Sequence, residues 1–197
     1  MTISTRDQLI DAMGNNASRI VISKASLANA AAGQFFSLWA ATGVPGAGAA
    51  PTTAAVPTSA TTGAMGFTNQ TAPATSYLAW LAVLFGNSAS NLEIHDRLAH
   101  MGGLSGTVTT SQGALSLVTN SPGASRLGDA NYSDVQWWLE IYTALGATGV
   151  NATVAVEYND GTTGNLAAIA LGATPRAGRL YPLVSAVAGK FIRAVTG

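Results

Sequence analysis

The chain has 197 residues, of which nine are Lys or Arg and nine are Asp or Glu, so 9% of its side chains are charged and the formal net charge is zero. An ordinary soluble domain carries about 25% charged residues, and the balance of signs excludes the long basic field that drives sequence-independent nucleic-acid binding. The absence of cysteine excludes disulfides, thiolate catalysis, zinc–thiolate sites and iron–sulfur clusters.

The length corresponds to one domain that is large enough to bury a core. Hydrophobic residues reach 48%, but 37 residues are alanine and only 7% are aromatic, so we expect an uncharged surface rich in small residues. The longest apolar run, Tyr77–Phe85, has nine residues, whereas a transmembrane helix needs about 20. Residues 1–11 contain charges and no apolar signal-peptide core. We therefore expect a cytosolically made protein without a membrane span.

The N-terminal segment, residues 1–18, predicts a short helix followed by a turn. Ser4 and Asp7 have the spacing of a capping box in its acidic form. Three apolar residues then share one helical face before Gly14: Leu9, Ile10 and Met13.

Two strands are predicted next. Residues 19–24 are rich in β-branched residues and are bounded by polar ones. Residues 35–39 form a short aromatic and apolar run, and the chain reaches Gly43 soon afterwards. Both patterns favour a strand over a helix.

The segment 43–75 has a different composition. It contains four of the seven prolines in 33 residues dominated by Ala, Thr and Gly, which excludes a persistent helix. It also lies inside residues 25–92, a stretch of 68 residues without Asp, Glu, Lys, Arg or His. Long loops are usually functional or disordered, but free disordered linkers usually carry charge. We therefore expect an extended arm that contacts a partner.

The apolar run 77–85 and the run 92–98 flank a short connection of Gly, Asn, Ser and Ala. This arrangement favours two antiparallel strands joined as a hairpin. A buried helix over 77–85 remains the alternative, because Leu78, Leu81 and Phe85 also share a helical face.

The C-terminal half has the clearest strand patterns. Residues 135–143 alternate between apolar and polar side chains, as in a half-buried strand. Residues 151–158 repeat the alternation, with an inward-facing set of Val154, Val156 and Tyr158. The turn-forming residues 159–161 then predict a hairpin that returns along 166–171.

Three further strands are expected at 114–119, 179–185 and 190–195. Pro182 interrupts the second of them and cannot donate a ladder hydrogen bond, so it should place that strand at a sheet edge.

Eight or nine short strands without alternating helices predict an all-β fold, specifically a β-sandwich or jelly roll. The expected organisation is an N-terminal helix and turn over 1–18 and a single β-sandwich domain over 19–197. The extended arm at 43–75 would belong to that domain.

The best candidates for catalysis are His95, Asp96 and His100, since these are the only histidines and a carboxylate adjoins one of them. On a strand, however, His95 and Asp96 point to opposite faces, and two histidines lack the third ligand of a metal site. Ser105 lacks the glycine spacing of a nucleophile elbow. We therefore assign no catalytic residue, metal ligand or cofactor site.

Other side chains also have a functional and a structural interpretation. Glu140 and Glu157 could pair across strands like the carboxylates of a glycosidase, but both occupy polar strand faces, which favours solvation. Trp138 follows Trp137, so one of the two is expected to pack in the core while the other faces outward. An outward Trp138 can stack on a sugar or on a protein partner, and a loosely covered core position for Trp138 is the structural alternative.

Several stretches share a characteristic composition: Ser37–Gly43, the Pro/Gly/Ala arm from Pro45, Ile94–Leu98 with Gly102–Ser105, and Tyr158–Gly164. Together, over about residues 35–175, they resemble structural proteins of tailed bacteriophages. The resemblance implies a head-associated virion component. Such proteins are commonly β-sandwich decoration or cement proteins that assemble as trimers on the shell, and no catalytic residues carry over.

The sequence thus predicts a capsid decoration or cement protein, not an enzyme, that is made in the host cytoplasm and assembled on the capsid surface. Its expected partners are the major capsid protein and further copies in a homotrimer, through residues 25–92. Nucleic acid, membrane, metal and cofactors are not expected. The alternative is a tail or fibre module that binds glycans through Trp138 or Tyr142. An enzyme using His95 and Asp96 is the remaining hypothesis.

Overall fold

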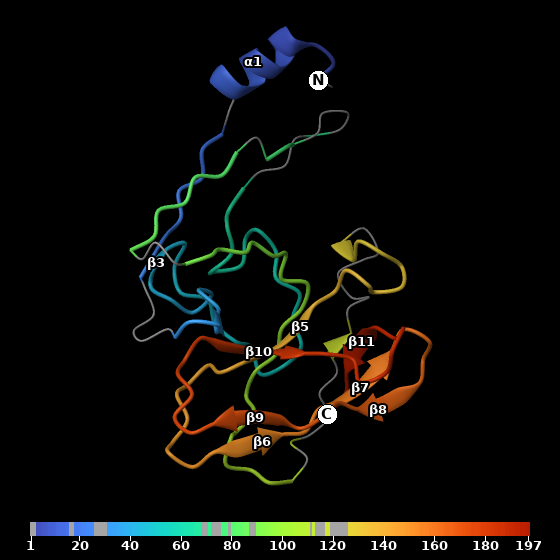
Figure 1. Ribbon diagram of the computed structural model, residues 1–197. Helices are drawn as coiled ribbons and strands as arrows, with labels where there is room; N and C mark the ends of the chain where they lie inside the picture. The colour runs from blue at the N-terminus through green and yellow to red at the C-terminus, as the bar shows by residue number, and fades with distance from the viewer. Residues whose placement is uncertain are drawn as a thin grey trace.

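The computed structural model describes residues 3–15, 18–25, 31–67, 71, 76–78, 80–86, 90–110, 112, 117–118 and 126–197. Most strands lie at one end of the molecule, and a single short helix lies at the opposite end (Figure 1).

The helix α1 (Arg6–Gly14) confirms the first predicted element. Its capping box is formed by Thr5 and Gln8 and not by Ser4 and Asp7: the Gln8 backbone N–H donates to Thr5 Oγ1, and the Thr5 N–H donates to Gln8 Oε1, both at 3.3 Å. A glutamine at this position makes the reciprocal bond that the aspartate, one residue earlier, does not make. None of the residues of α1 is buried.

The described residues form several small antiparallel sheets and one short helix, which agrees with an all-β fold class. The bounds within the described residues are β1 (Ser23–Lys24), β2 (Phe35–Phe36), β3 (Gly43–Val44), β4 (Leu117–Val118), β5 (Trp137–Glu140), β6 (Val150–Ala152), β7 (Ala155–Tyr158), β8 (Thr163–Asn165), β9 (Ile169–Gly172), β10 (Arg179–Leu183) and β11 (Ile192–Val195). The sheet orders are β1-β3, β2-β10-β5, β4-β11-β7-β8 and β6-β9.

The core lies on β7 and β11. The inward-facing set predicted from the alternation is correct: Val154, Val156 and Tyr158 are buried, and they pack with Leu166, Ile192 and Val195. The side chains of Trp137 and Leu183, from the sheet β2-β10-β5, pack against this cluster. The Trp137 indole N–H also donates to the Ile192 carbonyl at 2.9 Å. Two of the sheets therefore share one core.

The predicted hairpin is confirmed, but each of its two sides is divided into two strands. The outgoing chain forms β6 and β7, the turn follows Tyr158, and the return forms β8 and β9. β7 pairs with β8 while β6 pairs with β9 in a separate sheet. At this division, the Leu166 N–H donates to the Val154 carbonyl at 2.9 Å, and both side chains enter the core.

The prediction that Pro182 marks an edge strand is wrong for β10 as a whole, which lies between β2 and β5. The partner β2 contacts only Arg179 and Leu180, however, while Pro182 has Trp138 of β5 as its one ladder partner. The missing N–H therefore falls where the strand has a single neighbour, and the sheet tolerates it.

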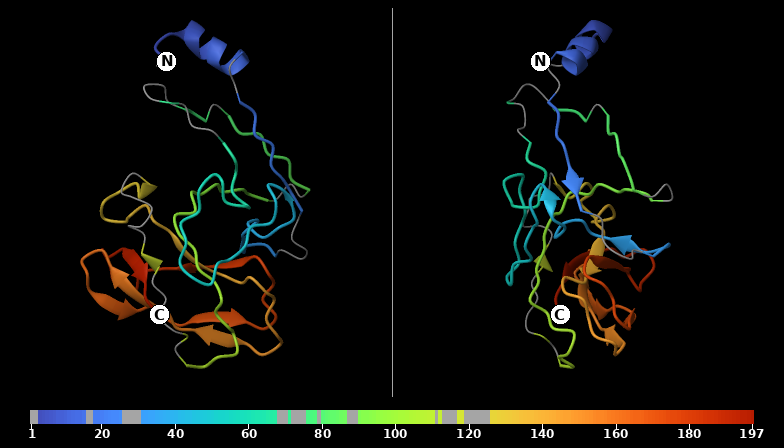
Figure 2. Two further views of the ribbon diagram at one scale, coloured as in Figure 1. Left: turned by 180° about the vertical axis from the view of Figure 1, so that it is seen from behind. Right: turned by 90° about the vertical axis from the view of Figure 1, so that its left-hand side faces the viewer.

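Three predicted strands are largely unpaired. Of residues 19–24, only Ser23 and Lys24 pair, with β3. The described parts of 77–85 and 92–98 contain neither strand nor helix, so the predicted hairpin does not form within the chain. We call the described residues of 18–22 and 76–94 the neck. In Figure 1 and Figure 2 the neck runs between the strand-rich body and α1.

The prediction that 43–75 forms an extended arm is wrong for its described first part. Residues 43–67 fold back with turns near 59–60 and 62–63. The Ala55 and His100 backbones form an antiparallel bridge, and the Gly102 N–H donates to the Pro51 carbonyl at 2.7 Å. This part of the arm therefore packs onto its own chain.

Replacing the fully buried Val156 by alanine tests the core. The loss of two buried methyl groups and the resulting cavity should cost about 2 kcal/mol of unfolding free energy, measured by urea denaturation. Val184→Ala is the control, because Val184 is 69% exposed and its truncation should change stability by no more than about 0.5 kcal/mol. Equal effects would contradict the placement of the core.

Candidate assembly surface

Trp39 makes several contacts at the base of the neck, which is the end of the neck that joins the strand-rich body. Its indole N–H donates to the Ala49 carbonyl at 3.0 Å, which attaches the arm to the ring. The Arg97 guanidinium carbon lies 4.6 Å from the ring centroid, and the His100 ring meets the indole edge-on at 5.4 Å. Cation–π and edge-to-face contacts of this kind each contribute about 0.5–1.5 kcal/mol. Trp39 thus joins the arm to the chain that leaves the neck.

Two glycines allow the arm to approach this ring. A Cβ on Gly48 would overlap the Trp39 indole, and a Cβ on Gly63 would lie 2.6 Å from the Gly48 Cα. The Gly48 N–H donates to the Trp39 carbonyl at 2.8 Å, and the Tyr142 hydroxyl donates to the Gly48 carbonyl. The Gly48 N–H, its carbonyl and its Cα thus each have a neighbour, and there is no room for a side chain at this position.

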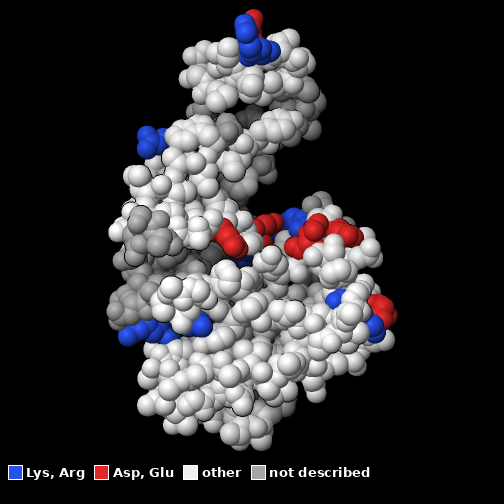
Figure 3. Space-filling model, in the orientation of Figure 1, with Lys and Arg blue, Asp and Glu red and all other residues white. Residues whose placement is uncertain are grey.

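The charged groups at the base of the neck bind one another. Arg97 pairs with the half-buried Glu140 at 3.1 Å, and Arg126 holds Asp96 through two hydrogen bonds of 2.6 and 2.9 Å. Arg126 also donates to the Pro57 carbonyl at 3.2 Å, so the arm is fixed here too. Figure 3 shows charged side chains gathered at this level, whereas most of the surface above and below is uncharged.

The candidate catalytic residues are each engaged separately. His95 Nε2 lies 3.0 Å from Glu93 Oε2, Asp96 binds Arg126, and His100 packs on Trp39. Across the described ranges, no group of three or more His, Cys, Asp or Glu side chains is placed to hold a metal ion.

Ser105 and the two glutamates also have local partners. Ser105 Oγ lies 2.9 Å from Thr107 Oγ1. Glu140, on the sheet β2-β10-β5, pairs with Arg97. Glu157 lies 3.4 Å from Arg193, and both of these residues are on the sheet β4-β11-β7-β8. The two carboxylates therefore lie on different sheets and have different cationic partners.

The two aromatic residues of the glycan hypothesis make contacts within the chain. Trp138 lies against Phe35, with ring centroids 5.2 Å apart and a tilt of 57°. The Tyr142 hydroxyl is bound to Gly48. Trp137 is the tryptophan that packs on the core, as the adjacency of the pair suggested. A sugar would have to use the remaining faces of rings that are already engaged.

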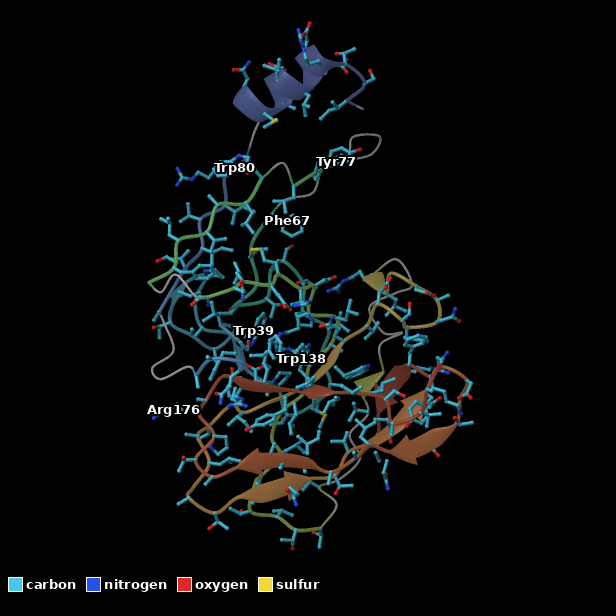
Figure 4. All side chains as sticks on the ribbon, in the orientation of Figure 1. Trp39, Phe67, Tyr77, Trp80, Trp138 and Arg176 are labelled. Atoms are coloured by element: carbon cyan, nitrogen blue, oxygen red, sulfur yellow. The ribbon has the colours of Figure 1, made fainter. Side chains whose placement is uncertain are left out.

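The most exposed apolar side chains lie on the neck. Leu84 is 99% exposed, Leu78 80% and Trp80 69%. Figure 4 shows Tyr77 and Trp80 on the part of the neck towards α1, far from Trp39. The other large neck residues that are exposed are Ile20, Val21, Ile22, Tyr77, Leu81, Val83, Phe85, Leu92 and Ile94. Soluble monomers rarely expose contiguous apolar patches of more than a few hundred Å².

The total accessible surface agrees with this observation. It is 12916 Å² for a chain of 19.9 kDa, whereas a monomeric globular protein of that mass exposes about 8,700 Å². One copy thus leaves about 4,000 Å² more in contact with water than a globular monomer would. Because its large apolar side chains are exposed, the neck is the candidate functional site, as a surface that needs a partner.

Sequence reasoning located the uncharged region but missed its internal organisation. The sequence predicts that residues 25–92 contact a partner as a whole, yet Trp39 and Arg126 bind the first part of the arm. The scarcity of charge could have pointed to Arg97 and Arg126. In a chain with only nine basic residues, some are expected to bind specific groups, and these two bind Glu140 and Asp96.

Gly48→Ala tests the packing at Trp39. The new methyl group would overlap the indole, and overpacking of this kind costs about 1–3 kcal/mol, so we expect a lower urea midpoint and altered tryptophan fluorescence. Gly46→Ala is the matched control, because its Cβ would meet nothing closer than Thr62 Cγ2 at 3.8 Å. If Gly48→Ala were as stable as Gly46→Ala, the ring would not be packed against Gly48.

His100 predicts a pH dependence of stability. Burial lowers the pKa of His100 below its ordinary value of 6.5, and the charge of Arg97 lowers the pKa further. The unfolded chain then binds a proton at a higher pH than the folded chain. Stability is consequently greatest above about pH 6.5 and falls as the pH drops below it. Urea midpoints at pH 7.5 and 5.5 should show this fall.

His100→Gln should reduce the difference between the two pH values. His95→Gln should retain it, because that substitution leaves His100 in place. An unchanged pH dependence in His100→Gln would show that His100 is not responsible.

Comparisons with known proteins do not add a function to this geometry. No protein-family model, no curated protein and no solved structure matches the chain. Among the described residues, no helix is long and apolar enough to cross a membrane. The function therefore has to be inferred from the residues and the surface of this chain.

Proposed function

We propose that the chain is a structural virion protein of a tailed bacteriophage, a decoration or cement protein that binds and stabilises the head shell as a homotrimer. The observation that carries the proposal is the neck, which has no charged residue over 76–92, carries charges at Arg19 and Glu93, and exposes large apolar side chains. A contact of this kind is driven by apolar burial. The composition of residues 35–175 and its resemblance to phage structural proteins give the virion context.

The β-sandwich or jelly-roll architecture is part of this proposal. In its favour, the sheets β2-β10-β5 and β4-β11-β7-β8 share one core through Trp137 and Leu183. Two antiparallel sheets that pack face to face define a sandwich. Such a body would hold the neck at a constant position above the shell.

Within residues 25–92, the contact region excludes the first part of the arm. The backbone carbonyls of Gly48, Ala49 and Pro57 there accept hydrogen bonds from Tyr142, Trp39 and Arg126, respectively. The neck remains available, with its apolar groups exposed. The neck, and not the prolines of the arm, is the surface that we assign to contacts with the major capsid protein and with further copies.

A glycan-binding tail or fibre module is the alternative. It would use Trp138 or Tyr142, and both rings already make contacts within the chain. The two functions predict different positions in the particle.

Purified virions provide the test. Mass spectrometry should detect the chain, and electron cryomicroscopy with an antibody against it should label the head. Label on the tail, together with glycan-array binding that is lost in Trp138→Ala, would support the alternative. A chain that is absent from virions would contradict both proposals.

A further inference from the structure

We infer that the neck completes β-sheets with a second copy of this chain: the segments 19–22, 77–78 and 80–85 are strands whose partners lie in another protomer. This rests on the self-assembly part of the proposed function and specifies the residues and the mode of contact.

The first argument is the conflict between sequence and structure in these two segments. Both have the β-branched, aromatic and aliphatic composition of strands. Within the part of the chain that the structure describes, the backbones of 18–22, 77–78 and 80–86 make no hydrogen bond to another backbone. Unpaired N–H and C=O groups on an extended segment are a template for a strand from another chain.

The second argument is that neither face of the segment 77–85 is covered. Side chains alternate between the two faces of a strand, yet Leu78, Trp80 and Leu84 at even positions and Leu81 and Phe85 at odd positions are all exposed. A continuous apolar run is typical of a strand that is buried on both faces. Pairing at the strand edge alone would leave both faces in water, so the second copy must also cover the side chains.

The third argument concerns charge. A contact between two identical surfaces brings each residue near its own counterpart or near the same neighbours, and like charges there would repel. Residues 25–92 contain no charged side chain and no histidine. Two copies of 77–85 can therefore approach each other without charge repulsion, whereas the segment 19–22 carries one charge, on Arg19.

The fourth argument is the area. One copy exposes 12916 Å², about 4,000 Å² above the value for a globular monomer. Obligate interfaces bury about 2,000–5,000 Å² counted over both partners. The excess is therefore sufficient for two interfaces per copy, as a closed trimer requires.

The base of the neck also fits this role. Arg126 holds Asp96 and the Arg97 carbonyl, and Arg97 holds Glu140 and packs on Trp39. The chain that leaves the neck is thereby fixed to β5 and to the arm. A segment that is fixed at its base loses less conformational freedom when it pairs.

The test compares the purified chain with two variants in the absence of any shell protein. Wild-type chain should elute as an oligomer in size-exclusion chromatography with light scattering. Leu84→Asp places a charge on the neck and should shift the mass to that of a monomer. Val184→Asp is the control, because Val184 is 69% exposed but lies after β10, outside the neck; this variant should remain oligomeric.

Hydrogen exchange of the wild-type chain tests strand pairing without relying on a variant. The amides of 77–86 should be protected in the oligomer, and their protection should fall on dilution to the monomer. The far-UV circular dichroism spectrum of Leu84→Asp should differ from that of the wild-type chain only by the small loss of strand signal from the unpaired neck. A monomeric wild-type chain, or an oligomer whose 77–86 amides exchange freely, would overturn the inference.

Binding to purified shells separates this inference from the proposed function. If the wild-type chain were monomeric but bound and stabilised shells, the shell-binding part of the proposed function would stand without the homotrimer, and the neck would be a surface for the capsid protein. If the chain assembled through the neck but bound no shell, the self-assembly inference would stand and the decoration function would fail.

Discussion

The rest of the structure depends on one constraint: a chain with eighteen charged side chains must bury its apolar groups, and one copy does not bury those of the neck. The strand-rich body satisfies the constraint internally, through Val156 and its neighbours on β7 and β11. The neck does not, since Leu84 is almost completely exposed. Apolar burial is the dominant favourable contribution to association. Self-assembly and shell binding are two ways to meet the same requirement.

The contacts of Trp39 connect these two parts of the molecule. Its indole N–H donates to the Ala49 carbonyl of the arm, its ring packs against Gly48, and Arg97 lies over the same ring. Because Arg97 also binds Glu140 of β5, the base of the neck is attached to the sheet that shares the core. Arg97 thus fixes the geometry of the junction, while residues 76–92 of the neck carry no charge.

The sequence predicted those elements whose partners are local. The helix near Thr5 and the hairpin around Tyr158 were found because capping and strand alternation act over a few residues. The unpaired state of 77–85 was missed because a strand pattern does not say which chain supplies the partner. The contacts of Trp39 with His100 and Arg97 join residues about sixty positions apart, and nothing in the local pattern of either segment predicts them.

Sedimentation equilibrium of the purified chain, over micromolar concentrations and without a shell protein, tests the central claim most directly. The exposed neck predicts a molar mass that is a multiple of 19.9 kDa and that changes little between low and high salt, because apolar contacts are not screened. A mass of 19.9 kDa at every concentration would contradict the claim that the neck is a surface for a second copy.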